Sequence, residues 1–175
     1  MAGGRGSPVK TLHLLRHAKS AWDRPSLPDR ERGLNRRGRR DAPRMGAALA
    51  RRTRPMPVYV SAAKRARLTL EGLCSGWPAL AAMPHRVDED LYTISDEELF
   101  HWIAARDDGV DAVLLIGHNP ALTDLVNALC GRRCVGNVPT AGYVRLSLHI
   151  DRWRDLLQGC AVIEERLFPK ELPDP

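Results

Sequence analysis

Aromatic residues are scarce in this sequence, and their scarcity excludes one class of binding protein. Phe, Trp and Tyr make up 5% of the 175 residues, and none is interleaved with the arginines that crowd positions 24 to 54. Proteins that bind single-stranded nucleic acids stack aromatic side chains on the bases beside a basic groove. The sequence therefore predicts no nucleic-acid partner, despite its formal net charge of +6. The arginine-rich stretch is usually a solvated face, and docking of an acidic or phosphorylated partner is the alternative interpretation.

Long apolar runs are also missing. No run approaches the roughly 20 residues that cross a bilayer, and residues 1–8 lack the apolar stretch of a secretion signal. We expect a cytoplasmic protein without membrane contact. The length and the 43% hydrophobic content suit one domain with a substantial core. That domain is expected to cover residues 1–175 as a monomer, with flexible ends at 1–9 and 169–175.

Cysteine is present but is not arranged as a metal site. The four cysteines lie at positions 74, 130, 134 and 160. Cys130 and Cys134 alone have a spacing that suggests zinc, and a structural zinc site needs four ligands. In a protein that is not secreted, such residues are expected to be reduced thiols. We predict no metal and no disulfide.

Short apolar runs in this sequence end abruptly at polar side chains. A run without polar alternation is typical of a parallel strand buried on both faces, and apolar residues at helical spacing follow these runs. The pattern predicts an α/β fold. Because ligands bind beyond the carboxyl ends of such strands, the polar side chains there are expected to lie together. The runs are Leu12–Leu15, which ends at Arg16 and His17; Pro57–Val60, which ends at Ser61 ahead of Arg65; and Ala112–Ile116, which precedes His118 and Asn119.

The segments between these runs complete the expected architecture. Proline and glycine among charges predict an irregular loop over residues 21–34, lying over the carboxyl edge of the sheet. A helix is expected from Asn35, a good N-cap, although Pro43 requires either a later start near Ala42 or a kink. Alternation from Tyr143 to Ile150 predicts a strand with one wet face. An edge strand at 86–91, a helix from Ser95 to Ile103 and a last strand at 159–167 are also expected.

The side chains at the carboxyl edge suit the transfer of a phosphoryl group. Arg16 and Arg65 can grip phosphate oxygens through forked donors, and His118 can complete an anion site without a metal. Nearby positive charge favours neutral His17, whose ring nitrogen could attack phosphorus and form a covalent phosphohistidine. Asn119 is a candidate substrate contact at the same edge. The alternative is that each histidine is a hydrogen-bonded structural residue, so the convergence of these groups is what favours chemistry.

Three segments, in matching order, resemble the histidine phosphatase superfamily, which includes the phosphoglycerate mutases. Leu-Leu-Arg-His-Ala-Lys-Ser resembles its Arg-His-Gly signature, with Ala18 in place of the usual glycine, a change expected to restrict the backbone. The segment from Ser61 to Thr69 resembles the second block, and Ile-Gly-His-Asn-Pro resembles the third. The compact chain is most similar to the SixA branch, the phosphohistidine phosphatases.

The resemblance carries expectations about fold, site and substrate. It implies a three-layer α/β/α fold with a mostly parallel central sheet, and no cofactor. It implies that His17 is the nucleophile, that Arg16, Arg65 and His118 hold the phosphoryl group, and that Ser20 adds a contact. The implied partner is a phosphorylated protein, such as a histidine phosphotransfer domain. A small phosphate ester as substrate, and a phosphate-binding module without turnover, are the alternatives.

A general acid is not evident in the sequence. Glu89 and Asp90 lie in the right region by resemblance to larger relatives, but they equally fit an acidic surface turn. The surface interpretation is favoured because no apolar pocket that would raise a carboxyl pKa is visible. A site without a strong acid suits phosphohistidine, since imidazole leaves more readily than an alkoxide. A mutase is disfavoured because the loops are short for a closed lid.

Overall fold

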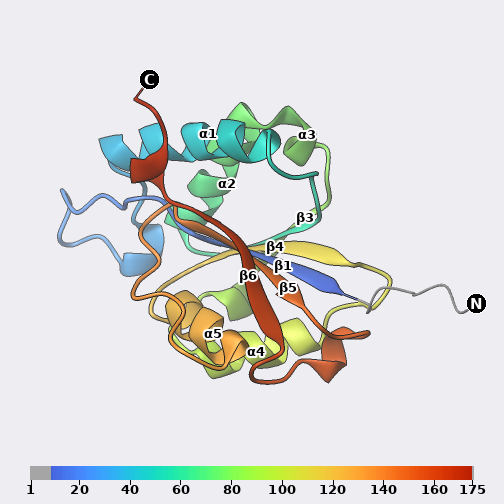
Figure 1. Ribbon diagram of the computed structural model, residues 1–175. Coiled ribbons are helices and arrows are strands. Elements are labelled where there is room, and N and C mark those ends of the chain that lie inside the picture. Colours follow the sequence, from blue (N-terminus) through green and yellow to red (C-terminus); the bar gives the residue numbers. More distant parts are fainter. Residues whose placement is uncertain (1–8, 175) are drawn as a thin grey trace, which may run out of the picture.

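The computed structural model describes residues 9–174, so the flexibility expected of the first eight residues concerns a segment outside the described part. Six strands form one sheet in the order β3-β2-β4-β1-β5-β6 (Figure 1). β3, β2, β4 and β1 pair in parallel, while β5 is antiparallel to both of its neighbours. The predicted α/β fold with a mostly parallel sheet is confirmed. The strands are β1 (Lys10–Arg16), β2 (Val58–Ser61), β3 (His85–Asp88), β4 (Ala112–Gly117), β5 (Tyr143–Leu148) and β6 (Ala161–Leu167).

Helices cover both faces of this sheet. Figure 1 shows α1, α2 and α3 on one face and α4 and α5 on the other. The helices are α1 (Arg36–Ala50), α2 (Lys64–Gly76), α3 (Pro78–Ala81), α4 (Asp96–Ala104) and α5 (Ala121–Cys130). Short 3-10 helices are η1 (Asp29–Glu31), η2 (Glu89–Leu91), η3 (Trp153–Asp155) and η4 (Pro169–Glu171). The chain therefore has the expected three layers.

Burial of β1 on both faces explains its continuous apolar sequence. Leu12 and Leu14 pack in the core beneath α4 and α5, whereas Leu15 packs in the core beneath α1 and α2. Successive side chains of a strand point to opposite faces of the sheet, so the run Leu12–Leu15 contributes side chains to the core on each face. His13, the polar interruption, is 2% exposed, and its Nδ1 lies 2.7 Å from the Tyr143 hydroxyl. That hydrogen bond satisfies the buried ring.

α1 begins at Arg36 rather than at Ala42. The Asn35 side chain accepts a hydrogen bond from the Gly38 N–H at 2.9 Å, which is the predicted N-cap. The helix then runs to Ala50 with Pro43 inside it. The start near Ala42 that sequence reasoning offered as one alternative is thus wrong, because the cap and the packing of the first turns outweigh the one hydrogen bond that proline removes.

The wet face that alternation predicted for Tyr143 to Ile150 is only partly present, since His149 is exposed and Arg145 is half-buried. Tyr143 is 1% exposed and Ser147 is 8% exposed. β5 lies between β1 and β6 in the sheet, and Tyr143 packs among apolar residues beneath α1 and α2. Tyr143 is satisfied by its hydrogen bond with His13, and half-buried Arg145 pairs with Glu165. Neighbouring elements thus bury polar positions of β5 that the alternation assigned to water.

The segment after Phe168 is packed up to the end of the described residues. Pro169–Glu171 forms η4, and Leu172 packs against the core beneath α1 and α2. The Arg44 side chain donates from Nη2 to the Pro173 carbonyl at 2.6 Å. These contacts join residues 169–173 to α1 and to the core, and the expected flexibility of the tail stays a prediction. Within residues 9–174, no helix combines the length and the apolarity needed to cross a bilayer.

Candidate active site

The two histidines at the strand ends lie side by side. β1 pairs with β4 so that Arg16 is opposite Gly117, and the His17 N–H donates to the Gly117 carbonyl at 3.0 Å. His118 follows Gly117 directly, so parallel register brings it next to His17. The ring centroids of His17 and His118 are 5.1 Å apart. Residues about a hundred positions apart in sequence therefore share one end of the sheet.

The protonation state of His17 is set by its surroundings. The ring Nδ1 lies 2.8 Å from the Ala18 carbonyl, which can only accept a hydrogen bond, so Nδ1 carries the proton. Burial lowers the pKa of His17 to about 4, and the charges of Arg65 and Arg16 act in the same direction. The imidazole is neutral at pH 7, and its Nε2 bears a lone pair.

His118 is buried beside Ser61, the last residue of β2. The His118 Nε2 lies 2.7 Å from the Ser61 hydroxyl oxygen, which also accepts the Ala63 N–H at 3.3 Å. Burial lowers the pKa of His118 to about 3, with His17 as the next cause. Within residues 9–174, its buried Nδ1 has no hydrogen-bond partner. If Ser61 donates to Nε2, then Nδ1 is left as a donor for an anion.

Arg65, from the first turn of α2, is held by the loop that precedes α1. Its Nη1 donates to the Asp29 carbonyl at 2.8 Å, and its Nη2 donates to the Asp29 carboxylate at 3.0 Å. The Tyr92 hydroxyl donates to the same carboxylate oxygen. The hydrogen bond from Tyr92 is the largest cause that lowers the pKa of Asp29, so this carboxylate is ionised. The guanidinium fork is thus occupied by an internal anion.

These groups surround a cavity of about 430 Å³. It combines imidazoles, a guanidinium and a tyrosine with carboxylates at its margin, a composition suited to an oxyanion. Its lining residues are His17, Asp29, Arg65, Tyr92, Thr93, Ile94, Glu98, His118 and Asn119.

Arg16 is not among the residues that line the cavity. Its Nη1 donates to the Val138 carbonyl at 3.0 Å, and its buried Nε has no partner within residues 9–174. Burial lowers the pKa of Arg16, and its charge still lowers the pKa of both His17 and His118. Arg16 therefore contributes a nearby positive charge and a donor that an anion could satisfy.

The two candidate substrate contacts, Ser20 and Asn119, differ in their position relative to the cavity. Ser20 is 8% exposed, forms a backbone bridge to Leu34 and lies outside the cavity lining. Asn119 lines the cavity, but its amide nitrogen donates to Asn137 Oδ1 at 3.0 Å and to the Val138 carbonyl at 2.9 Å. Its oxygen accepts the N–H and the hydroxyl of Thr123. The amide of Asn119 thus ties the segment near Val138 to α5.

Ala18 fits the backbone without strain. Among residues 9–174, Ala141 is the one non-glycine residue with a positive φ, so the position after His17 does not need glycine. The Ala18 N–H donates to the Thr69 hydroxyl at 2.9 Å, and that hydroxyl donates to the Arg65 carbonyl at 2.7 Å. Thr69 is fully buried and connects the residue beside His17 to the turn that carries Arg65.

Ala141 stabilises the end of β1 from the other side of the chain, since its N–H donates to the Arg16 and His17 carbonyls.

Sequence reasoning missed Asp29 and Tyr92 as site residues. It predicted a loop over the carboxyl edge, which signalled the region of Asp29 but not the residue that reaches Arg65. Glu89, which it left open as an acid, lies on the surface in an ion pair with Arg30 that lowers its pKa. Its neighbour Asp90 is exposed as well. The acidic turn is therefore a surface feature.

Comparison with known proteins places this geometry in a family. Residues 12–95 match the model of the histidine phosphatase superfamily (branch 1). An uncharacterized protein of Mycobacterium tuberculosis (strain H37Rv) is 30% identical over 159 residues, covering 85% of this chain and 96% of that protein. The chain belongs to the histidine phosphatase superfamily. The first two of its three signature segments lie within the residues that the family model matches.

Solved structures place this histidine phosphatase near the SixA type. The protein assigned as phosphohistidine phosphatase SixA in Agrobacterium tumefaciens is 28% identical, with a TM-score of 0.77 over 91% of this chain and 98% of that one. The protein histidine phosphatase SixA complexed with tungstate is 22% identical, with a TM-score of 0.75 over 91% of this chain and 97% of that one. The fold of this chain is thus that of the compact SixA structures.

Proposed function

We propose that this histidine phosphatase hydrolyses phosphohistidine in proteins, through a covalent phosphoryl group on His17. The observation that carries the proposal is the His17 imidazole itself. The Ala18 carbonyl holds its proton on Nδ1, 2.8 Å away, and burial keeps the ring neutral. Nε2 is therefore a nucleophile in the resting protein and needs no base to remove a proton.

The reaction takes place in two steps. In the first, Nε2 of His17 forms a bond to phosphorus while the bond from phosphorus to the substrate imidazole breaks. The substrate ring carries a proton on its other nitrogen and so leaves as neutral imidazole, while His17 keeps its Nδ1 proton on the Ala18 carbonyl. In the second, water attacks phosphorus, the bond to Nε2 breaks, and inorganic phosphate leaves with the protein regenerated. Arg65 and the half-buried charge of Arg16 offset the negative charge that builds on the phosphoryl oxygens, together with a donor from His118.

The surroundings of the leaving group favour phosphohistidine as substrate. Asp29 is held ionised by Tyr92 and Arg65, and an ionised carboxylate cannot donate a proton. Glu89 is ion-paired on the surface. An alkoxide leaving group needs a proton, whereas an imidazole departs with much less assistance. The likeness to the Agrobacterium tumefaciens protein supports the same substrate class.

Hydrolysis by His17→Ala and by His17→Asn tests the proposal. Wild-type protein mixed with a histidine-phosphorylated protein carrying a radioactive label should release phosphate and retain label on the chain after denaturation in alkali. Both variants should lose release and labelling, and a chelator should change neither in the wild type. Phosphate release that survives in both variants would reject His17 as the nucleophile.

A comparison of substrates separates this proposal from the small-ester alternative. The same preparation is assayed with phosphoramidate, with a phosphohistidine peptide and with simple alkyl phosphates. We expect kcat/KM to be largest for the phosphohistidine peptide. A preference for alkyl esters would assign the protein to small-molecule phosphate esters, and tight phosphate binding without turnover would make it a binding module.

A further inference from the structure

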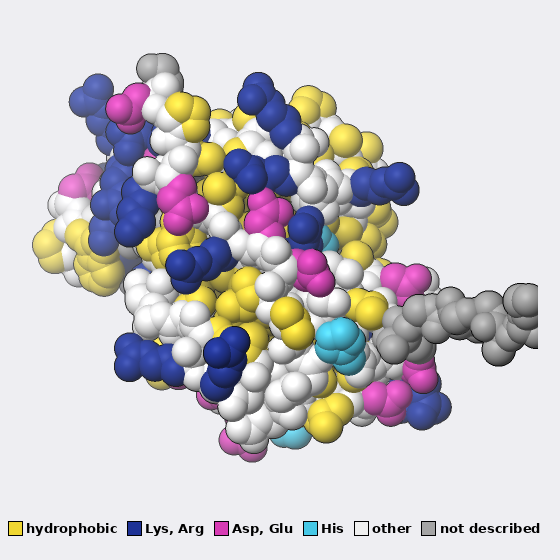
Figure 2. Space-filling view, in the orientation of Figure 1, with side chains coloured by type: hydrophobic (Ala, Val, Ile, Leu, Met, Phe, Trp, Pro, Cys, Tyr) yellow, Lys and Arg dark blue, Asp and Glu magenta, His cyan; other side chains and the backbone are white. Residues whose placement is uncertain are grey.

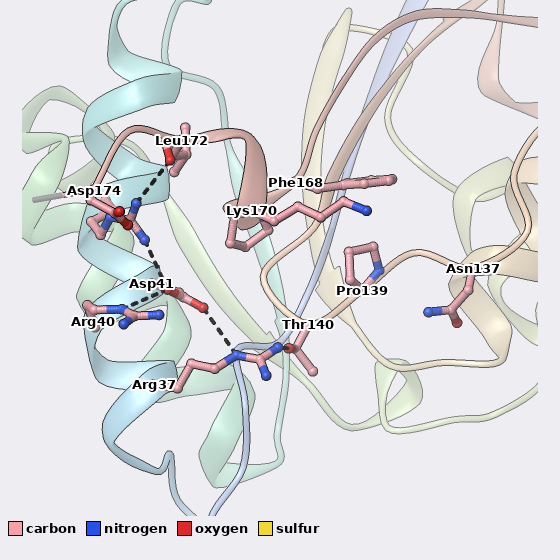
Figure 3. Close-up of a pocket in the computed structure, with 12 residues that line it drawn as sticks. Arg37, Arg40, Asp41, Asn137, Pro139, Thr140, Phe168, Lys170, Leu172 and Asp174 are labelled. Carbon is pink, nitrogen blue, oxygen red and sulfur yellow. Dashed lines mark hydrogen bonds and ion pairs between the residues drawn. The ribbon is translucent and has the colours of Figure 1, made fainter.

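A second cavity, of about 500 Å³, adjoins the 430 Å³ cavity of the candidate active site, which we call the catalytic cavity. Asn137 lines the second cavity, Asn119 lines the catalytic one, and their side chains are hydrogen-bonded at 3.0 Å. Figure 3 shows side chains from the first turns of α1 facing the segment 137–140 and the C-terminal segment across this space. A molecule bound at the catalytic cavity therefore has this second cavity as a neighbour.

A buried carboxylate organises the basic side chains of the second cavity. The side chain of Asp41 is 3% exposed, and it lies 3.6 Å from Arg37 Nε, 3.3 Å from Arg40 Nε and 3.3 Å from Arg44 Nη1. Arg37 and Arg40 approach Asp41 through Nε. Arg37 Nη2 also donates to the Thr140 hydroxyl at 3.3 Å, so the terminal nitrogens left for a ligand are Nη1 of Arg37 and both of Arg40. Anchoring of this kind reduces the conformational entropy that a flexible side chain loses on binding.

The exposed donors of this cavity carry an excess of positive charge. Its lining contains four cations, Arg37, Arg40, Arg44 and Lys170, against two carboxylates, Asp41 and Asp174, which leaves an excess of two positive charges. Arg44 is occupied by Asp41 and by the carbonyls of Leu172 and Pro173. The side chains of Arg37 and Arg40 are 56% and 55% exposed. Figure 2 shows Lys and Arg side chains gathered where the C-terminal segment meets the first turns of α1.

We propose that this second cavity docks an acidic segment of the phosphorylated partner, next to the phosphohistidine that enters the catalytic cavity. The inference rests on the proposed function for its substrate and adds how that substrate is selected. Carboxylates of the partner would pair with the terminal nitrogens of Arg40 and Arg37 and with the Lys170 ammonium. The half-exposed guanidiniums suit side chains that arrive from a partner surface rather than a small ligand enclosed by the protein.

Paired peptide substrates test the docking. Two synthetic phosphohistidine peptides of equal length are compared, one with Glu and Asp beside the phosphohistidine and one with Gln and Asn at the same positions. We expect the wild type to prefer the acidic peptide by about tenfold in kcat/KM at low salt, as two or three exposed ion pairs would give. The preference should shrink as sodium chloride is added, because exposed charges are screened.

Charge reversal on the cavity removes that preference if the proposal is correct. The double variant Arg40→Glu with Lys170→Glu turns the excess of two positive charges in the lining into an excess of two negative ones. It should therefore lose the preference for the acidic peptide or favour the neutral peptide, and it should hydrolyse phosphoramidate at the wild-type rate. Arg51→Glu is the matched control, since it reverses an exposed arginine at the far end of α1 and should keep the preference. A preference that persists in the double variant, or that is absent from the wild type, would overturn the proposal.

Binding measured without turnover separates this proposal from the catalytic one. Fluorescence anisotropy of the unphosphorylated acidic peptide on His17→Ala reports docking even if neither phosphopeptide is hydrolysed. Saturable binding that the double variant loses would support the docking site independently of the proposed function. If inorganic tripolyphosphate binds more tightly than the acidic peptide and displaces it, the cavity is a site for a small anion, and the docking proposal is wrong.

Discussion

Arg65 is paired with Asp29 inside the candidate active site, with Nη2 3.0 Å from the carboxylate and Nη1 2.8 Å from the main-chain carbonyl. An arginine that is expected to bind a phosphoryl group is therefore bound to an anion of the protein itself. The pair keeps the guanidinium in position before substrate arrives. It also means that an oxyanion competes with Asp29 for one side of the fork.

Asp29→Asn should bind oxyanions more tightly than the wild type. The change removes the competing charge and keeps the main-chain contact to Arg65. Loss of one partly exposed ion pair corresponds to about 1 kcal/mol, so the inhibition constant for tungstate should fall about fivefold. Glu89→Gln is the control, because it removes an exposed carboxylate that pairs with Arg30 and not with Arg65. Weaker tungstate binding by Asp29→Asn would contradict this expectation. It would show that Asp29 helps binding by holding Arg65 in position more than it hinders binding by competing with the oxyanion for Arg65.

Thr69→Val should impair both stability and catalysis. The valine leaves the buried Ala18 N–H without its acceptor, at a cost of about 1–3 kcal/mol in the free energy of unfolding. It also releases the link between Arg65 and the residue beside His17, so kcat should fall while KM for phosphoramidate changes little. Urea unfolding and steady-state kinetics measure the two effects. Thr69→Ser, which keeps the hydroxyl, should restore kcat, and failure of that rescue would contradict a positioning role.

Stability should fall as the solution is acidified below about pH 6.5. The pKa values of His13 and His17 are lowered to about 4 and that of His118 to about 3, from an ordinary value of 6.5. Between about pH 6.5 and pH 4, the histidines of the unfolded chain bind protons that the same histidines in the native protein do not bind. Acid therefore favours unfolding. Each histidine accounts for at most about 2 kcal/mol by pH 5. Urea unfolding at pH 7 and pH 5 measures the loss.

A variant at His13, which lies outside the site, measures how much of that loss of stability one buried histidine causes. His13→Gln removes one of the three buried histidines, so the difference in unfolding free energy between pH 7 and pH 5 should shrink by roughly a third. His101→Gln, which changes an exposed histidine, should leave the difference as it is. An identical pH dependence in wild type and His13→Gln would contradict the assignment.

The decline of kcat/KM at acid pH should occur well below pH 6.5, the ordinary pKa of histidine. Because kcat/KM reports the free protein, its decline should follow protonation of His17, near pH 4. Rates on phosphoramidate are expected to stay within about twofold between pH 7 and pH 5 once the folded fraction is accounted for. A decline centred near pH 6.5 would show that His17 is not kept neutral by burial.

Gly46→Ala should destabilise the protein even though alanine favours helices. A Cβ at Gly46 would lie 2.2 Å from the Leu73 carbonyl oxygen on α2. Helix propensity alone would stabilise the variant by about 1 kcal/mol, whereas forced separation of α1 and α2 costs about 1–3 kcal/mol. Gly136→Ala, where the nearest atom is 3.7 Å away on the Arg133 side chain, is the control. A thermal unfolding midpoint above that of the wild type would contradict close packing at Gly46.

The sequence by itself determined where the short buried strands lie and which histidines follow them. Buried parallel strands are short and continuously apolar, so Leu12–Leu15 and Ala112–Ile116 could be recognised locally. Parallel strands have their carboxyl ends at one edge of the sheet, so the sequence predicted that His17 and His118 lie close together. The N-cap at Asn35 was also local, because it depends on a few consecutive residues.

The tertiary structure alone decided which loop residue reaches Arg65 and which side chains are buried on β5. Asp29 contacts a residue 36 positions away, and no periodic pattern encodes where an irregular loop comes to rest. The burial of Tyr143 depends on β6 and α1 covering it, and the order of the C-terminal segment depends on Arg44. These features arise from contacts between distant segments, whose energies are set by packing rather than by neighbours in the chain.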